Sequence, residues 1–395
     1  MACPIPALGR MSAIAARTRM RQRLDLTDLY HDAYTAYVEA FRRQTELVAS
    51  EILLEHLLDQ SGAVKALEGR PEAAPSVTAY QFHKKLLDYF SDKGELIPGE
   101  DGRLLPSEAV RRRVADKESA SAADRATLGE MFEFLQRYRG LAGPVLAGKD
   151  ALATMDLQFG MQSSLKFWEY SMIRLPAKKP CNVMLARVLL AKLAESPGIS
   201  VFEGGAGLGV VLREALSDPR FLPLSKNLAR YDYTDISALL MEAGKQWLRT
   251  HAPADLFQRI QFQRLDLDAL STAGNAFARA ASVDLIVLEH VLYDVRDLHA
   301  TLQAFHTMLK PGGQLAFTMS FRDRPSLFFP NEFFQSMLHT YNKAKLDPPR
   351  REHVGYLTLR EWELSLRAAG FSEWEVYPAP EDHAKWPFGG IVAYR

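Results

Sequence analysis

The sequence has few cysteines, no long hydrophobic run and no excess of charge of either sign. Cys3 and Cys181 are the only cysteines among 395 residues, so we expect no disulfide framework, and this usage fits a reducing cytoplasm. No apolar stretch approaches the ~20 residues that span a bilayer, so no membrane segment is predicted. The 48 basic side chains balance the 48 acidic ones. Without a global basic field, nucleic acid is not expected as a partner. No Cys/His clustering indicates a metal site.

One glycine-rich stretch organises the chain, which is otherwise of ordinary globular composition. Residues 198–203 form a short apolar run that ends in Glu203. Gly205, Gly207 and Gly209 follow at alternate positions, and a segment with helical spacing begins at Val210. A buried strand that runs into a glycine turn and a helix is typical of the first unit of a doubly wound α/β domain. Glycines in such a turn let the backbone come close to a ligand, because a Cβ would collide with it.

The same stretch argues against a dinucleotide site. The residue three positions after Gly207 is Val210, so the G-x-G-x-x-G fingerprint is not met. Glu203 would also repel a pyrophosphate at the helix N-terminus. A cofactor that carries positive charge suits an acidic strand end better.

From residue 199 onward, strands and helices alternate, which predicts a parallel sheet with helices on both faces. We expect seven strands and therefore a Rossmann-like α/β fold. After the glycine strand, the predicted strands are Tyr231–Asp235, Ile260–Asp266, Val283–Leu288, Gln314–Met319, Glu373–Tyr377 and Ile391–Tyr394.

The N-terminal part is predicted to be mainly helical. Tyr30, Tyr34, Tyr37 and Phe41 recur at helical spacing, and a second helical face is followed by an expected hairpin over residues 94–105. Helix followed by hairpin resembles a winged-helix fold, which we interpret as a packing or homodimerisation module. The predicted organisation is a flexible terminus (1–25), with a transit peptide as its alternative, a helical N-terminal or lid domain (26–179) and a catalytic domain (180–395).

Several side chains at predicted strand ends are candidates for binding or chemistry. Asp235 lies one βαβ step after the glycines, where a carboxylate accepts ribose hydroxyls; its alternative is an N-cap for the helix near Ser237. Glu289, His290 and Tyr293 follow the fourth strand and form a candidate acid–base cluster. The ordinary pKa of histidine, about 6.5, suits removal of a hydroxyl proton, although a lone histidine is more often structural.

The order of these motifs resembles class I S-adenosylmethionine-dependent methyltransferases. The E-x-G-x-G-x-G turn matches their first motif, and four further segments are similar to the methyltransferase domains of polyketide synthases: residues 143–150, Tyr231–Ser237, Val283–Leu298 and Leu309–Gly313. The resemblance implies S-adenosylmethionine as cofactor and S-adenosylhomocysteine as product. It also implies a substrate carried as an acyl thioester, on an acyl carrier protein or free, and methylation at carbon or oxygen in polyketide-type biosynthesis.

The resemblance also assigns residues of the cofactor site. Glu203 would contact the methionine part of the cofactor, and Gly205, Gly207 and Gly209 would pass under it. Asp266 would accept a hydrogen bond from the adenine amine, with Asp268 as its alternative. The neighbouring Ile236, Leu267 and Glu289 would complete the site.

Two departures from the family pattern concern catalysis. Carbon-methylating members have a histidine after the fourth strand and a glutamate at the end of the fifth, where this chain has Tyr293 and Met319. The loss of this dyad favours, narrowly, an O-methyltransferase whose base is His290, Glu289 or His383. It also motivates the alternative of a non-catalytic relative that binds the cofactor or a carrier protein. The aromatic residues Phe159, Phe167, Trp168 and Tyr170 either close over the acceptor or only pack the lid onto the sheet. The chain is expected to be a free-standing enzyme.

Overall fold

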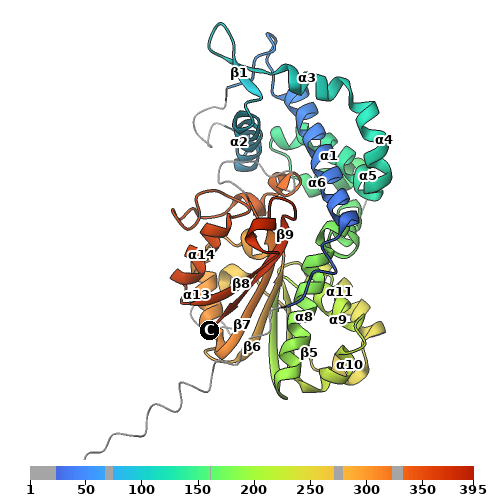
Figure 1. Ribbon diagram of the computed structural model, residues 1–395, viewed down its shortest axis with the longest axis vertical. Coiled ribbons are helices and arrows are strands. Elements are labelled where there is room, and N and C mark those ends of the chain that lie inside the picture. The colour runs from blue at the N-terminus through green and yellow to red at the C-terminus, as the bar shows by residue number, and fades with distance from the viewer. Residues whose placement is uncertain (1–23, 67–73, 161, 271–278, 323–331) are drawn as a thin grey trace, which may run out of the picture.

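The computed structural model describes residues 24–66, 74–160, 162–270, 279–322 and 332–395, and Figure 1 shows their arrangement. Of the flexible terminus predicted for residues 1–25, only Leu24 and Asp25 lie within the described residues. The Leu24 amide donates a hydrogen bond to the Tyr377 hydroxyl at 3.0 Å, so the chain is attached to the sheet from its first described residue.

The predicted seven-stranded α/β sheet is confirmed. Its order is β5-β4-β3-β6-β7-β9-β8. Strands β3 to β7 pair in parallel, and β9 is antiparallel to both of its neighbours. The strands are β3 (Ile199–Gly204), β4 (Leu228–Asp235), β5 (Ile260–Arg264), β6 (Val283–Glu289), β7 (Leu309–Ser320), β8 (Glu373–Tyr377) and β9 (Phe388–Tyr394).

Each face of the sheet has its own hydrophobic core because successive side chains of a strand point to opposite faces. In β6, Leu285 and Val287 belong to the core beside α8, whereas Ile286 and Leu288 belong to the core beside α13 and α14. Helices thus cover both faces of the sheet, as Figure 1 shows. They are α8 (Lys179–Glu195), α9 (Val210–Leu216), α10 (Phe221–Leu224), α11 (Ala238–His251) and α12 (Ala254–Phe257), with α13 (Leu298–Met308) and α14 (Leu359–Ala368).

The N-terminal region is mainly helical, as predicted, and lies beyond one end of the sheet (Figure 1). Its helices are α1 (Asp32–His56), α2 (Val77–Asp92), α3 (Glu108–Ala115), α4 (Lys117–Leu128), α5 (Glu130–Leu146), α6 (Ala151–Phe159) and α7 (Ser163–Glu169). The expected hairpin is present as β1 (Leu96–Pro98) paired with β2 (Leu104–Pro106). The apolar side chains of these helices and of one sheet face form a single core, so the two regions pack as one unit. A winged-helix role and a homodimer stay predictions.

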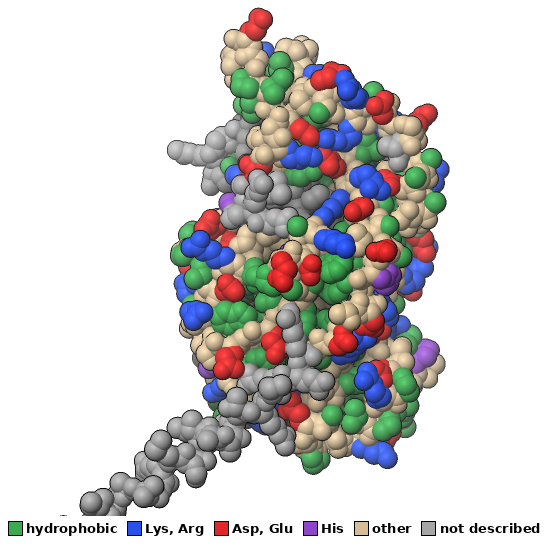
Figure 2. Space-filling model, viewed as in Figure 1, with side chains coloured by type: hydrophobic (Ala, Val, Ile, Leu, Met, Phe, Trp, Pro, Cys, Tyr) green, Lys and Arg blue, Asp and Glu red, His purple; other side chains and the backbone are tan. Residues whose placement is uncertain are grey.

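Two aspects of the surface follow from the composition. Among the described residues, no helix is long and apolar enough to span a membrane. Basic and acidic side chains are interspersed on the face shown in Figure 2.

A buried ion-pair group joins α2 to the C-terminal α/β region. Lys85 of α2 lies 3.6 Å from the Glu332 carboxylate, which also pairs with Arg322 at 2.5 Å. Tyr341 donates a hydrogen bond to the same carboxylate oxygen. Burial lowers the pKa of Lys85 to about 8, although the nearby Glu332 carboxylate opposes this shift. Glu332 therefore balances the charge of two buried cations across the interface.

Replacing Glu332 with glutamine should destabilise the protein, because two buried cations would then lack their anion. We expect the free energy of unfolding in urea to fall by about 3 kcal/mol or more. Glu100→Gln, at an exposed position of the hairpin, is the matched control and should leave the midpoint unchanged. Equal midpoints for the two variants would contradict this role of Glu332.

Candidate active site

The candidate site lies where the strand order reverses. Strand β3 pairs with β4 on one side and with β6 on the other, so the carboxyl ends of β3 and β6 are neighbours. Open α/β sheets bind their ligands in the crevice at this point. The glycine turn after β3 and the Glu289–His290 segment at the end of β6 therefore lie next to each other.

The glycine turn uses the left-handed conformation at every second residue. Gly205, Gly207 and Gly209 have φ of 65°, 50° and 78°, a region that residues with a Cβ rarely occupy. A Cβ on Gly205 would lie 2.4 Å from Val291 Cγ2, and one on Gly207 would lie 2.5 Å from Met172 Cε. The positive φ angles favour glycine at all three positions, and at Gly205 a Cβ would also clash with the branched side chain of Val291.

Hydrogen bonds that involve side chains of β4 hold this turn in place. The Tyr233 hydroxyl donates to the Gly207 carbonyl at 2.8 Å, and the Gly207 amide donates to Asp235 Oδ2 at 2.8 Å. Thr234 Oγ1 donates to the Glu203 carbonyl, also at 2.8 Å. The turn is thus prepared by side chains of the neighbouring strand.

Three buried carboxyl groups surround the turn: Glu203, Asp235 and Glu289. Burial raises the pKa of Glu203 to about 8, and the nearby Asp235 and Glu289 add to the rise against the opposing Tyr231 hydrogen bond. Burial also raises the pKa of Asp235 and of Glu289. In each case the protein supplies less positive charge than the carboxylate needs. The group of residues fits a ligand that brings a cation, and a sulfonium with an ammonium meets that requirement.

Asp235 supports the turn and is not the helix cap. Its Oδ1 accepts a hydrogen bond from the Ser237 amide at 2.6 Å, and the Ser237 side chain caps α11 by accepting from the Leu240 amide. Each oxygen of an ionised carboxylate accepts two hydrogen bonds. Asp235 therefore keeps acceptor capacity for the hydroxyl groups of a nucleoside.

The candidates for the adenine end occupy different environments. Ile236 is 55% exposed beside the turn, whereas Leu267 is buried. Asp266 lies two residues beyond the end of β5, is exposed, and accepts a hydrogen bond from the Asp268 amide. Asp268 accepts from the Arg296 amide at 2.8 Å, so it holds the loop after β6. Asp266 has fewer protein partners than Asp268, and its adenine role stays a prediction.

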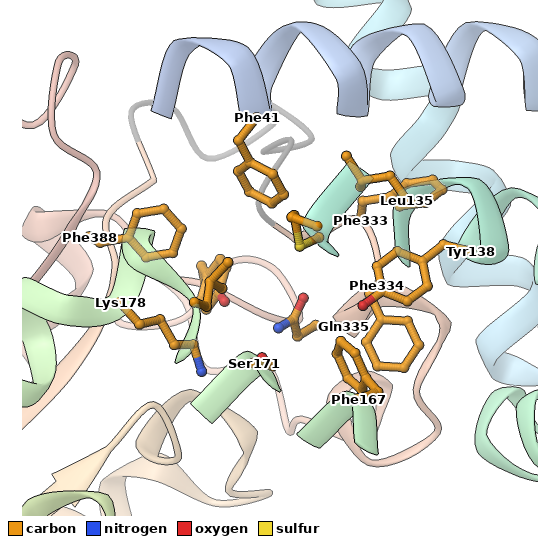
Figure 3. Close-up of a pocket in the computed structure, with 13 residues that line it drawn as sticks. Phe41, Leu135, Tyr138, Phe167, Ser171, Lys178, Phe333, Phe334, Gln335 and Phe388 are labelled. Atoms are coloured by element: carbon orange, nitrogen blue, oxygen red, sulfur yellow. The ribbon is translucent and has the colours of Figure 1, made fainter. Parts of the chain in front are cut away.

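A small pocket with a volume of about 30 Å³ lies between the N-terminal helices and the sheet edge. Figure 3 shows the aromatic rings that surround it and the polar side chains that lie among them. Its walls come from α1, α5, α7, residues 333–335 and β9, so the helical region supplies much of the lining. The labelled aromatic residues are Phe41, Tyr138, Phe167, Phe333, Phe334 and Phe388; the labelled polar ones are Ser171, Lys178 and Gln335.

Lys178 connects this pocket to the carboxylates. Its ammonium lies 3.6 Å from Glu289 Oε1, and both side chains are almost fully buried. At this distance the two groups form an ion pair, but they are too far apart for a hydrogen bond. The Tyr34 hydroxyl of α1 donates to the carbonyl of the preceding Ala177 at 3.1 Å. The segment carrying Lys178 is thereby fixed against the N-terminal helices.

His290 and Tyr293 are both buried, and neither lines the pocket. The His290 ring lies with its centroid 6.1 Å from that of Phe388 and 6.4 Å from that of Tyr356, so it is one layer behind the wall. Within the described residues neither ring nitrogen has a hydrogen-bond partner. Burial, together with nearby Lys178, lowers the pKa of His290 well below its usual value. Its ring is thus neutral near pH 7. Burial raises the pKa of Tyr293 well above its ordinary value, so this phenol is not an anionic base.

The other candidates have separate positions. His383 is buried and stacks on Phe321, with ring centroids 3.8 Å apart, and is not part of the pocket lining. Met319 is fully buried in β7. Four aromatic residues were considered as a lid, and of these Phe167 lines the pocket. Trp168 packs against the Phe167 ring, and Tyr170 packs against α5. Phe159 is 37% exposed. In the part of the chain that the structure describes, no cluster of metal-ligating side chains occurs.

Comparison with known proteins identifies the fold family. Residues 180–376 match the model of a methyltransferase domain. The chain belongs to the methyltransferase domain family. Over 181 residues it is 30% identical to the highly reducing polyketide synthase azaB of Aspergillus niger, covering 45% of this chain and 7% of that synthase.

Solved structures extend the likeness to the N-terminal region of this methyltransferase. The carbon methyltransferase of CurJ superposes with a TM-score of 0.71 at 19% identity, covering 93% of this chain and 96% of that one. The trans-methyltransferase CalH, solved in complex with S-adenosylhomocysteine, gives 0.61 at 17% identity and 91% coverage of each chain. At these identities the likeness concerns the fold, which includes the helical region.

Sequence reasoning missed polar residues of the pocket. Lys178, Ser171 and Gln335 were not singled out, whereas Phe41 was noted for its helical spacing and Phe167 as a candidate lid residue. The signal for Lys178 was weak, since two adjacent lysines precede an apolar helix. Only the packing shows that Lys178 is buried while Lys179 is exposed.

Replacing Gly244 of α11 with alanine should displace the glycine turn of this methyltransferase, because α11 packs directly against the turn. The new Cβ would lie 2.1 Å from the Tyr233 hydroxyl and 2.8 Å from the Gly207 carbonyl. We expect a loss of about 1–3 kcal/mol of stability from overpacking, which exceeds the gain in helix propensity of about 1 kcal/mol.

Gly140→Ala is the matched control, because its Cβ would meet its nearest neighbour, Phe159, at 3.7 Å. This variant should be as stable as the wild type or slightly more so. Thermal melts check both changes. Stabilisation by Gly244→Ala would contradict the close packing of α11 against the turn.

Proposed function

We propose that this chain is an S-adenosylmethionine-dependent methyltransferase that acts on an acyl group in polyketide-type biosynthesis. The observation that carries the proposal is that an acidic site and an apolar pocket lie next to each other. Three buried carboxyl groups surround a glycine turn, and Lys178 links one of them to an apolar pocket. A cationic cofactor suits the carboxyl groups of the first site, and the apolar lining of the second site suits an acyl chain.

The residues have distinct roles in this proposal. Glu203 would face the methionine part of the cofactor, Asp235 the ribose and Asp266 the adenine, with Ile236 and Leu267 beside the rings. When bound, the cofactor supplies a methyl group on a positively charged sulfur. The chain contributes positioning, because the pocket aligns the acceptor with that methyl group, and its aromatic walls exclude water.

The acceptor would be a carrier-bound or free acyl thioester. The names of similar proteins support this class, since they include polyketide synthases and carbon methyltransferases. The chain spans 7% of azaB and 9% of the compactin diketide synthase mlcB of Penicillium citrinum, so the activities of those whole enzymes are not transferred. Carbon and oxygen of an enolisable acyl group are both candidate methyl acceptors.

A second candidate function is binding without catalysis. The observation in its favour is that Tyr293 and Met319 stand where carbon-methylating relatives have a histidine and a glutamate. Both functions require the cofactor site, and only the first requires methylated product.

Titration calorimetry with S-adenosylmethionine tests the cofactor site, using Asp235→Ala as the variant. We expect micromolar binding by the wild type and at least a hundredfold loss in the variant, because the ribose acceptor and the anchor of the Gly207 amide are both removed. Asp255→Ala, on exposed α12, is the control and should bind normally. A folded, cofactor-free wild type that does not bind would overturn the proposal. Incubation with ketoacyl and hydroxyacyl thioesters then distinguishes catalysis, which adds the mass of one methyl group, from binding alone.

Cofactor affinity should rise with pH between about 6 and 7.5. The pKa of Glu203 is about 8 in the free protein, so this carboxyl is mostly protonated in that range and must lose its proton to face a cation. Affinity then gains up to about tenfold per pH unit. Calorimetry in buffers of different ionisation enthalpy should detect proton release. Glu203→Gln should flatten the profile, and an equally steep profile in this variant would assign the proton elsewhere.

A further inference from the structure

We propose that Lys178 is the residue that binds the acceptor, by holding an oxygen of the acyl group that carries or develops negative charge. This inference rests on the proposed function and narrows its substrate class. The ligand would combine an apolar chain with a carbonyl or carboxylate-like oxygen at the end nearest the carboxylates. Lys178 was not among the residues that the sequence motifs indicate.

The position of the ammonium supports this assignment. Lys178 is the lysine of the pocket lining, and its side chain is 5% exposed. Figure 3 shows it among aromatic rings, on the same side of the pocket as Ser171. Burying a lysine costs free energy unless its ammonium is well paired, because the ammonium loses its hydration. An ammonium has three hydrogen-bond donors, and the ion pair with Glu289 at 3.6 Å is too long to satisfy one of them well.

The charges around Lys178 also favour an anionic oxygen as its partner. Glu289 is shared between Lys178 and the carboxylate group near the glycine turn, and its Oε1 has no hydrogen-bond partner among the described residues. Once a cationic cofactor faces these carboxylates, the negative charge available to Lys178 decreases. A negatively charged oxygen in the pocket would restore the balance. The order of charges across the site would then be carboxylates, cation, acceptor oxygen and ammonium.

The neighbours of Lys178 define the rest of the acceptor site. The Ser171 hydroxyl and the Gln335 amide also line the pocket, together with the Tyr138 hydroxyl, and they supply further hydrogen bonds to a thioester or ketone. Phe41, Leu135 and Phe334 line the apolar part. Glu289 acts through Lys178 and is therefore a positioning residue in this proposal.

The test uses calorimetry on the full chain to compare the affinities of two ligands of equal chain length, octanoate and 1-octanol. Wild type should bind octanoate at least about tenfold more tightly than octanol, because hydrogen bonds between charged groups in a buried site are worth this much or more. Lys178→Met should remove the preference and leave octanol affinity unchanged. Lys179→Met is the matched control, since Lys179 is exposed and pairs with Glu214; it should keep the preference.

The outcomes separate this inference from the proposed function. A Lys178→Met protein that retains the preference for octanoate, or a wild type that has none, would overturn the assignment. If the single variant fails to fold, because Glu289 is left without its cation, Lys178→Met combined with Glu289→Gln removes both charges and gives the same comparison. Cofactor binding is measured in parallel. If the wild type prefers octanoate but does not bind the cofactor, the proposed methyl transfer is refuted, whereas Lys178 remains an anion-binding residue.

Discussion

The structure of the site depends on the burial of three carboxyl groups at the carboxyl edge of the sheet. Glu203, Asp235 and Glu289 are withdrawn from water by the layers that make the fold stable, namely helices on both sheet faces and the N-terminal region above them. Burying a carboxylate without a matching cation costs free energy and raises its pKa. Among the described side chains near these groups, Lys178 supplies the one ion pair, with Glu289. The folded protein therefore holds a site whose electrostatics a cationic ligand improves.

The glycine turn and the N-terminal helices shape different parts of the same site. The turn has to bring backbone close to a ligand, so its glycines adopt left-handed conformations that Tyr233 and Asp235 hold in place. The helices have to close the site without filling it. They do so by sharing a hydrophobic core with the sheet and by fixing individual segments, as Tyr34 fixes the Ala177 carbonyl and Met172 covers Gly207. The stacking of Trp386 on Tyr30 joins the C-terminal segment to the same arrangement.

Sequence predicts the features that local pattern controls. The apolar run before Glu203, the alternate glycines and Asp235 at the end of the next strand lie where the sheet topology brings them together, because parallel strands share one carboxyl edge. Features that depend on packing between distant segments were not predictable. His290 suited a base by its ordinary pKa, yet burial keeps it neutral and behind the pocket wall. Lys178 and Lys179 are chemically identical neighbours, and the turn into α8 buries one and exposes the other.

The energetics of Lys178 bear on the choice between an enzyme and a binding module. A buried ion pair is often no more stabilising than apolar side chains of similar volume, so stability alone does not explain a lysine and a glutamate between the glycine turn and an apolar pocket. A module that only bound the cofactor would need the carboxylates, whereas an ammonium in the lining of an apolar pocket also suits a second ligand. Cofactor and acceptor positions side by side would favour catalysis over binding alone.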